Sequence, residues 1–240
     1  MPHVVVLTGA GISAESGIST FRDSQGLWAD HRIEDVATPE GWERDPERVL
    51  AFYNARRDEI RAAEPNAAHH ALARLEESGV RVSIITQNID NFHERAGSRD
   101  VLHLHGDIFK ARSSVDSKML YRLRGDEDIE LGDQCDKGYQ LRPHVVWFGE
   151  PVLLYDTACH IMADADWVLV VGTSLKVMPA AALIDEASDI TSKVVIDPNA
   201  DALVKGTGAT PIVGPAATHV PELVDHWIDS KRLSLPSRYQ

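Results

Sequence analysis

The sequence predicts an α/β protein in which a parallel sheet is covered by helices on both faces. Two observations predict this fold. Short apolar runs of strand length alternate with helical patterns through most of the 240 residues, which is typical of parallel strands joined by crossover helices. Small and polar residues directly follow several of these runs, at the strand ends that form the ligand crevice of such a sheet.

The first predicted strand, residues 3–7 (HVVVL), leads into a glycine-rich turn. In this turn Gly9-x-Gly11-x-x-Ala14 has dinucleotide-binding spacing: the glycines allow a tight turn and a close approach to a pyrophosphate, and the small third residue allows close packing. We expect a helix to begin here, with its N-terminus facing the phosphates. In such sites an acidic residue that binds the adenine ribose usually follows a second strand, about 20 residues after the glycine turn. No strand is predicted there, so Asp197, after a late strand, is the candidate ribose ligand.

The other elements follow from periodicity and from glycine and proline breaks. Apolar residues three and four apart predict helices, and β-branched runs bounded by turn residues predict strands. The expected helices span residues 46–63, 67–77, 155–163, 179–187 and 220–231, with a short helix ending at Ala96. The expected strands span residues 80–86, 101–104, 167–171 and 194–196.

Two polar tracts interrupt the alternation and predict a second, smaller domain. Residues 29–45 are broken by proline and glycine, and residues 108–142 are the least regular part of the chain. We expect a Rossmann-like domain interrupted by two insertions, which together form the small domain. The Rossmann-like domain comprises residues 1–28, 66–107 and 143–240, and the insertions are residues 29–65, which are helical, and 108–142.

The composition is that of an ordinary globular protein, with 43% hydrophobic and 25% charged residues. A net charge of −13 argues against non-specific nucleic-acid binding, which needs a cationic surface. No 18-residue apolar run occurs and no signal peptide precedes the first strand, so we expect a cytoplasmic protein without a membrane span. The two cysteines, Cys135 and Cys159, form no C-x-x-C pair, so we expect no disulfide framework.

Five stretches of small or polar residues share one predicted position, the carboxyl end of a strand. They are residues 9–13, 87–90, 105, 172–174 and 197–199. Because these ends meet at one edge of a parallel sheet, we expect them to form one site. Gly172, Thr173 and Ser174 offer N–H groups and hydroxyls to a phosphate or ribose, and the Asp197 carboxylate can accept from two ribose hydroxyls.

In their order along the chain, these motifs resemble the sirtuin family. The matching stretches are residues 9–18 (GAGISAESGI), 21–23 (FRD), 86–90 (TQNID), 105–106 (HG), 148–150 (FGE) and 172–174 (GTS). The resemblance implies an NAD-dependent protein-lysine deacylase that acts on acyl-lysine proteins. Residues 51–56 (AFYNAR) and 144–150 (HVVWFGE) are similar to the bacterial branch that removes succinyl as well as acetyl groups.

The resemblance also implies which residues bind NAD. Asp90 would hold the nicotinamide carboxamide, and Asn88 the nicotinamide ribose and a nearby water. The whole implied set is Gly9, Ala10, Gly11, Ile12, Ser13, Ser16, Gly17, Phe21, Arg22, Asp23, Trp28, Gln87, Asn88, Ile89, Asp90, Gly172, Thr173, Ser174, Asp197, Pro198, Asn199 and Ala216.

The implied catalytic residues are His105 and Asn88. In the family mechanism the acyl-lysine carbonyl oxygen attacks the ribose and nicotinamide leaves. His105 then acts as general base on a ribose hydroxyl, and the products are lysine, nicotinamide and O-acyl-ADP-ribose. Imidazole suits this step because its ordinary pKa near 6.5 leaves it neutral but basic. His103 would face the same side of a strand, but the neighbouring Gly106 favours His105.

Tyr53 and Arg56 are three residues apart in a predicted helix and therefore share a face. A phenol beside a guanidinium can bind a carboxylate, so with the resemblance this pair predicts that succinyl and malonyl groups are accepted. Val146, Phe148 and Gly149 are expected to bind the substrate peptide, with residues 148–149 extended beside it.

The chain departs from the family pattern within residues 108–142, where sirtuins usually carry four zinc-binding cysteines. Only Cys135 lies in this tract, with Ser113 near the place of a first cysteine. One thiolate cannot complete a tetrahedral zinc site, so we expect no metal.

Two other functions are open. One is an ADP-ribosyltransferase or NAD glycohydrolase that uses the same pocket. The other is a non-catalytic NAD-sensing module, against which the presence of both His105 and Asn88 argues. The sequence leaves the oligomeric state open.

Overall fold

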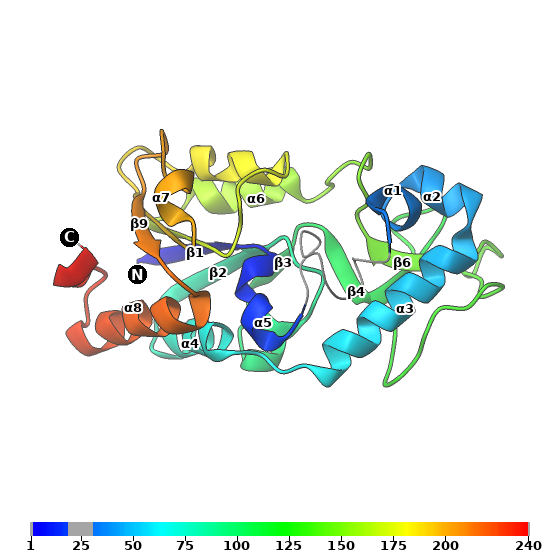
Figure 1. Cartoon of the computed structure of the whole chain (residues 1–240), viewed down its shortest axis with the longest axis horizontal. Helices are drawn as coiled ribbons and strands as arrows, with labels where there is room; N and C mark the ends of the chain where they lie inside the picture. The colour runs from blue at the N-terminus through cyan, green and yellow to red at the C-terminus, as the bar shows by residue number, and fades with distance from the viewer. Residues whose placement is uncertain (1, 19–30, 240) are drawn as a thin grey trace.

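The computed structural model describes residues 2–18 and 31–239 and contains two sheets of different kinds (Figure 1). The larger sheet has six strands in the order β3-β2-β1-β7-β8-β9, and the smaller has three in the order β5-β4-β6. The predicted fold class, a Rossmann-like α/β protein with a smaller second part, is confirmed.

All six strands of the large sheet run parallel, and β1 pairs with β2 on one side and with β7 on the other. The strands are β1 (His3–Thr8), β2 (Arg81–Thr86), β3 (Val101–His103), β7 (Trp167–Val171), β8 (Ser192–Asp197) and β9 (Thr210–Val213). The chain moves outward through β2 and β3 on one side of β1, and through β8 and β9 on the other. Such a reversal between β1 and β7 opens a crevice at the carboxyl ends of the strands.

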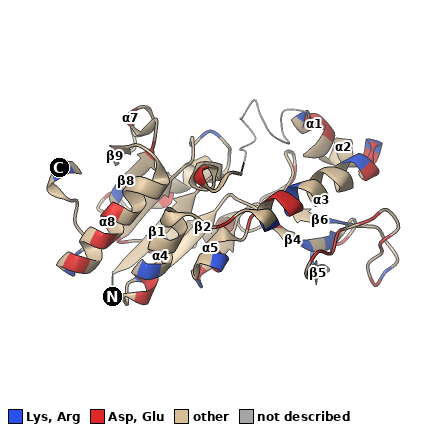
Figure 2. Ribbon diagram, turned by 60° about the horizontal axis from the view of Figure 1, so that its bottom comes forward, with Lys and Arg blue, Asp and Glu red and all other residues tan. Residues whose placement is uncertain are grey.

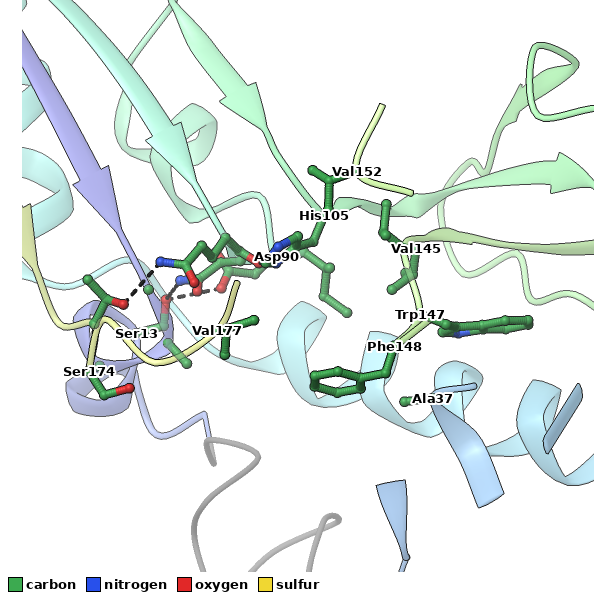
Figure 3. A pocket seen from close by; sticks show the side chains of 18 of the residues that line it. Ser13, Ala37, Asp90, His105, Val145, Trp147, Phe148, Val152, Ser174 and Val177 are labelled. Atoms are coloured by element: carbon green, nitrogen blue, oxygen red, sulfur yellow. Dashed lines mark hydrogen bonds between the residues drawn. The ribbon is translucent and has the colours of Figure 1, made fainter. Parts of the chain in front are cut away.

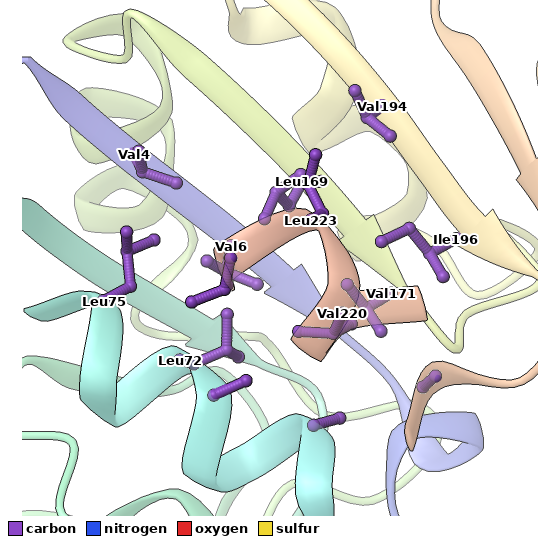
Figure 4. Packing of buried hydrophobic residues seen from close by; sticks show 14 of the residues in the cluster. Val4, Val6, Leu72, Leu75, Leu169, Val171, Val194, Ile196, Val220 and Leu223 are labelled. Carbon is purple, nitrogen blue, oxygen red and sulfur yellow. The ribbon is translucent and has the colours of Figure 1, made fainter. Parts of the chain in front are cut away.

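Helices cover both faces of this sheet. The helices α4 (Ala67–Glu77) and α8 (Ala216–Ser230) cover one face, and α6 (Tyr155–Ala163) with the 3-10 helix η3 (Ala180–Glu186) covers the other. Shorter elements are α5 (Phe92–Ala96), α7 (Ala200–Leu203) and η4 (Ser237–Tyr239). Val4 and Val6 of β1 pack toward α4 and α8 (Figure 4), whereas Val5 and Leu7 pack toward α6 and η3. Both faces of β1 are therefore buried, as expected for an uninterrupted apolar strand.

Among the described residues, the smaller part combines the antiparallel sheet with three helices. Its elements are α1 (Ile33–Val36), α2 (Pro39–Arg44), α3 (Pro46–Ala62), β4 (Gly106–Ser113), β5 (Leu120–Arg122) and β6 (Leu141–Val145). The Asp45 carboxylate caps α3 by accepting from a backbone N–H of the first turn at 3.0 Å. Arg57, fully buried on α3, donates to the Ile108 carbonyl and pairs with Asp128, both at 2.9 Å. These contacts fix α3 to β4 and to the loop between β5 and β6.

Charged side chains are distributed unevenly over these elements. The central strands β1 and β7 carry no lysine, arginine, aspartate or glutamate. Figure 2 shows the acidic and basic residues mainly on the helices and on the smaller part. The two central strands therefore contribute apolar packing.

The chain after the glycine turn differs from the expectation. Up to Ile18, where the first described stretch ends, no α-helix follows; η1 (Ala10–Ile12) and η2 (Ala14–Ser16) are single 3-10 turns. Gly17, with φ +83°, ends the second turn. The helix expected at residues 179–187 is likewise a 3-10 helix, η3.

The tracts expected to be irregular contain regular elements. The helices α1 and α2 lie within residues 29–45, and parts of all three strands of the small sheet lie within residues 108–142. The elements α1, α2 and β5 have four, six and three residues, too few for a periodic pattern. The sequence prediction also misses α7 and β9, and it begins α8 too late, at Val220. The proposed division of the chain at residues 29–65 and 108–142 stays a prediction.

Candidate active site

A pocket of about 610 Å³ lies between the carboxyl edge of the large sheet and the smaller part (Figure 3). All five strand-end stretches line it, through Gly9, Ala10, Gly11, Ser13, Gln87, Asn88, Ile89, Asp90, His105, Gly172, Thr173, Ser174, Asp197 and Asn199. The facing wall comes from α3 and from the chain at the end of β6, through Tyr53, Arg56, Ile60, Val145, Val146, Trp147, Phe148 and Gly149. The pocket thus has a polar floor and a mainly apolar wall.

The glycine turns after β1 and β7 cross at the point where the strand order reverses. The Gly11 N–H donates to the Gly172 carbonyl at 2.8 Å, and the Gly9 N–H donates to the Val171 carbonyl at 3.1 Å. A Cβ atom on Gly11 would lie 2.7 Å from the Gly172 Cα atom. The two turns therefore pack backbone against backbone, and this crossing forms part of the pocket floor.

Replacing Gly172 by alanine should lower the free energy of unfolding by about 2–5 kcal/mol. Gly172 has φ +61°, and an added Cβ would overlap the Ile12 backbone nitrogen. Gly138→Ala is the matched control, since Gly138 has φ +78° but no atom within 4 Å of the added Cβ, and it should cost only about 1–2 kcal/mol. Guanidinium denaturation measures both values. Equal losses would mean that the crossing of the turns imposes no requirement beyond backbone strain.

Three buried polar side chains form a network beside these turns. The Ser13 hydroxyl donates to Asp90 Oδ2 and accepts from Asn88 Nδ2, both at 3.0 Å. The Asn88 N–H in turn donates to the Thr86 hydroxyl at 3.0 Å. Burial raises the pKa of Asp90, although hydrogen bonds from the Phe92 N–H and Ser13 oppose the rise. The amide and the carboxyl are thus held in place for a polar planar ligand such as a carboxamide.

The imidazole of His105 is oriented by the chain that carries this network. Its Nδ1 lies 3.1 Å from the Gln87 carbonyl oxygen, and a carbonyl can only accept, so Nδ1 carries the proton. Nε2 then has a free lone pair. Burial lowers the pKa of His105 more than the Gln87 hydrogen bond raises it. His105, which lines the pocket, therefore presents a neutral imidazole whose Nε2 can accept a proton.

His103 is chemically different although it lies only two residues away. Its Nδ1 bonds to the Asn88 carbonyl at 3.1 Å and its Nε2 to Glu94 at 2.7 Å. Burial lowers the pKa of His103, but the Glu94 bond and charge outweigh burial and raise it. Because β3 ends at His103, strand alternation does not extend to His105. His103 has no free lone pair and does not belong to the described pocket lining.

Tyr53 and Arg56 both line the facing wall from α3. The Tyr53 hydroxyl accepts from Trp147 Nε1 at 3.0 Å, and Arg56 Nη1 pairs with Glu59 at 2.8 Å. Burial strongly raises the pKa of Tyr53, so its phenol keeps its proton at any working pH. The wall therefore presents a hydroxyl donor and a guanidinium together.

The sequence predicts an extended chain through Phe148 and Gly149, and this prediction is wrong. These residues form a turn in which Gly149 has φ +91° and the Phe148 N–H donates to the Ala37 carbonyl at 2.9 Å. The Val146 N–H donates to the His105 carbonyl at 2.9 Å. The glycine following Phe148 explains the turn, because it permits the left-handed conformation.

Several residues of the implied NAD set lie elsewhere. The side chains of Ile12, at the end of η1, and Ala216, at the start of α8, pack in the core between the sheet and α8. The Ser16 hydroxyl accepts from Asn66 at 3.1 Å. The described lining of the pocket includes none of these predicted residues: Ile12, Ser16, Gly17, Pro198 and Ala216. Four further predicted residues, Phe21, Arg22, Asp23 and Trp28, lie outside the described residues.

Some pocket residues were not among the predicted site residues. They are Ala37, Ile60, Val145, Trp147, Glu150, Pro151, Val152, Val177, Met178 and Pro179. All of them except Glu150 are apolar and look like core residues in a sequence. Only the folding of the smaller part against the sheet brings them to the site.

Residues 9–179 match the family model described as the Sir2 family. The chain belongs to the Sir2 family. An NAD-dependent protein deacylase of Aggregatibacter actinomycetemcomitans is 50% identical over 213 residues, covering 89% of this chain and 99% of the relative. Two solved structures also match the Sir2 protein. One is a Sir2 homologue–NAD complex, 41% identical, with a TM-score of 0.86 and 97% and 91% of the two chains covered. The other, a mutant Sir2 homologue with 2′-O-acetyl-ADP-ribose, is 40% identical, with a TM-score of 0.83 and coverage of 98% and 94%.

Two segments of this Sir2 protein meet at Cys135, within residues 108–142. Cys135 Sγ donates to the Ser113 hydroxyl at 3.3 Å, and Lys137 pairs with Asp116 at 2.9 Å. Within residues 2–18 and 31–239, no three histidine, cysteine, aspartate or glutamate side chains are grouped to hold a metal ion. No helix in the same ranges is both long and apolar enough to cross a bilayer.

Proposed function

We propose that this Sir2 protein is an NAD-dependent protein-lysine deacylase that removes acetyl, succinyl and malonyl groups. The observation that carries the proposal is the state of His105, a neutral imidazole with a free Nε2 in the same pocket as Asn88 and the glycine turns. The deacylase name of the Aggregatibacter relative and the complexes of Sir2 homologues with NAD and acetyl-ADP-ribose support it.

The residues of the pocket fit NAD in chemistry and position. The hydroxyls of Thr173 and Ser174, beside the glycine crossing, suit phosphate and ribose oxygens. Asp197 accepts from the Asn199 N–H through Oδ1 at 2.8 Å, and its Oδ2 suits ribose hydroxyls. Its negative charge disfavours the additional phosphate of NADP. Asp90, fixed by Ser13, suits the nicotinamide carboxamide.

NAD supplies a ribose carbon whose bond to nicotinamide can be broken. The Asn88 amide, held by Ser13 at 3.0 Å, positions the ribose and a water. His105 Nε2 removes a proton from a ribose hydroxyl, and its Nδ1–H bond to Gln87 stabilises the imidazolium that results. Acyl-lysine enters from the wall that carries Tyr53 and Phe148. We place its protein substrates in the cytoplasm, in line with the sequence prediction.

Peptide assays test the proposal. One peptide sequence is prepared with acetyl-, succinyl- and malonyl-lysine and incubated with NAD, and nicotinamide and O-acyl-ADP-ribose are followed by mass spectrometry. We expect both products in equal amounts, and no nicotinamide without acylated peptide. Nicotinamide release without peptide would instead indicate a glycohydrolase or ADP-ribosyltransferase. No release under any condition would indicate a module that binds NAD without turning it over.

A further inference from the structure

Trp147 lies directly beside Tyr53 in the wall of the pocket. Both side chains are 2% exposed, and both line the pocket. The indole Nε1–H donates to the Tyr53 oxygen at 3.0 Å, with the ring centroids 6.4 Å apart. An indole nitrogen can only donate, so the direction of this bond is fixed. Tyr53 is the acceptor.

The direction of this bond determines where the hydroxyl proton of Tyr53 points. A phenol proton stays near the ring plane and has two positions there, one on each side of the oxygen. Trp147 occupies one of these sides with its own N–H, so the Tyr53 proton takes the other. Among the described residues, none accepts that proton. The Tyr53 hydroxyl can therefore donate this proton in a hydrogen bond to a group that enters the pocket.

The indole is itself held by a buried ionic cluster. The Arg142 guanidinium carbon lies 3.2 Å from the centroid of the Trp147 ring. Glu150 binds Arg142 Nη1 at 2.8 Å and the Trp147 N–H at 2.8 Å, so one carboxylate fixes both the stacked cation and the backbone of the indole. Glu150 also binds Arg112 at 2.8 Å. With two arginines and one glutamate, the cluster behind the wall carries a net positive charge.

We propose that Trp147 is a positioning residue for acyl-group specificity: it directs the Tyr53 proton toward the terminal carboxylate of an acidic acyl group, and Arg142 and Glu150 hold the indole in place. This inference rests on the proposed function. An acetyl group has no second carbonyl or carboxylate to receive that proton. The arrangement should therefore favour succinyl and malonyl over acetyl, rather than raise turnover of all acyl groups.

The test is a double-mutant cycle between Trp147 and Tyr53. Trp147→Phe keeps an aromatic ring but removes the N–H group, and Tyr53→Phe removes the acceptor and its proton. For each variant, kcat/KM is measured on succinyl and acetyl forms of one peptide. We expect Trp147→Phe to lower the succinyl-to-acetyl ratio about threefold to tenfold. Added to Tyr53→Phe, it should change the ratio no further, because it acts through Tyr53.

The cycle separates this role from a merely structural one. Equal losses on both peptides, or an undiminished effect of Trp147→Phe in the Tyr53→Phe background, would overturn the inference. If Trp147→Phe folds poorly, Arg142→Lys takes its place, because lysine keeps the charge opposite Glu150 but lacks the flat guanidinium that lies on the indole. It should lower the same ratio, again only when Tyr53 is present. A wild-type protein that never acts on succinyl-peptide would refute the proposed function instead.

Discussion

Replacing His105 by asparagine should lower kcat for deacylation by about 10²–10⁴-fold, the usual contribution of a general base. Asparagine retains polarity and similar size but cannot take up a proton. NAD binding should persist, because the Ser13–Asn88–Asp90 network is joined by bonds that do not involve the imidazole. Stopped-flow or mass-spectrometric turnover assays, with NAD affinity measured by calorimetry, separate the two effects.

The matched control for this prediction is His70→Asn, on the exposed side of α4. It makes the same chemical change away from the pocket and should leave kcat unaltered. If His105→Asn lost NAD affinity and kept kcat at saturating NAD, His105 would be a binding residue and the assignment of the base would be wrong.

The pH profile gives an independent view of the same imidazole. Because burial lowers the pKa of His105, its neutral, basic form persists below the ordinary value near 6.5. The acid limb of kcat/KM should therefore have its midpoint below 6.5 and be absent from the residual activity of His105→Asn. A midpoint above 6.5 that disappears in the variant would contradict the neutral state assigned to this base.

The polar floor of the pocket could be predicted from the sequence for a physical reason. The strands β1, β2, β7 and β8 are covered on both faces, so each contains a continuous apolar run, and small or polar residues follow that run at the carboxyl end of the strand. Asn88 after β2 and Thr173 after β7 were found in this way. His105 was preferred over His103 on the resemblance and on Gly106, but the bonding that makes the two rings differ could not be predicted, because Glu94 and Gln87 meet them only in the folded chain.

The apolar wall could not be derived from sequence patterns for the opposite reason. Trp147 and Tyr53 are 94 positions apart, and Arg112 and Glu150 are 38 apart. No local spacing links either pair. Arg112 lies in β4 and Glu150 follows β6, and these two strands become neighbours only in the folded chain. Tyr53 was found because its partner Arg56 lies on the same helix, where spacing is informative.

Tyr53 and Arg56 are the subject of the second prediction with a large expected effect. Tyr53→Phe combined with Arg56→Met should lower kcat/KM for desuccinylation by about 10²–10⁴-fold, from the loss of two hydrogen bonds to a charged carboxylate at about 1.5–3 kcal/mol each. Deacetylation should fall far less, because acetyl presents no carboxylate to either side chain. The ratio of the two activities on one peptide sequence is the measurement that decides.

Arg61→Met is the matched control on the same helix. Arg61 pairs with Asp58 at 2.7 Å and does not line the described pocket, so its removal should leave the ratio unchanged. Arg56→Lys probes geometry, since lysine keeps the charge but loses the planar pair of donors, and it should fall between wild type and Arg56→Met. If the double variant lost both activities equally, Tyr53 and Arg56 would be holding the wall together rather than reading the acyl group.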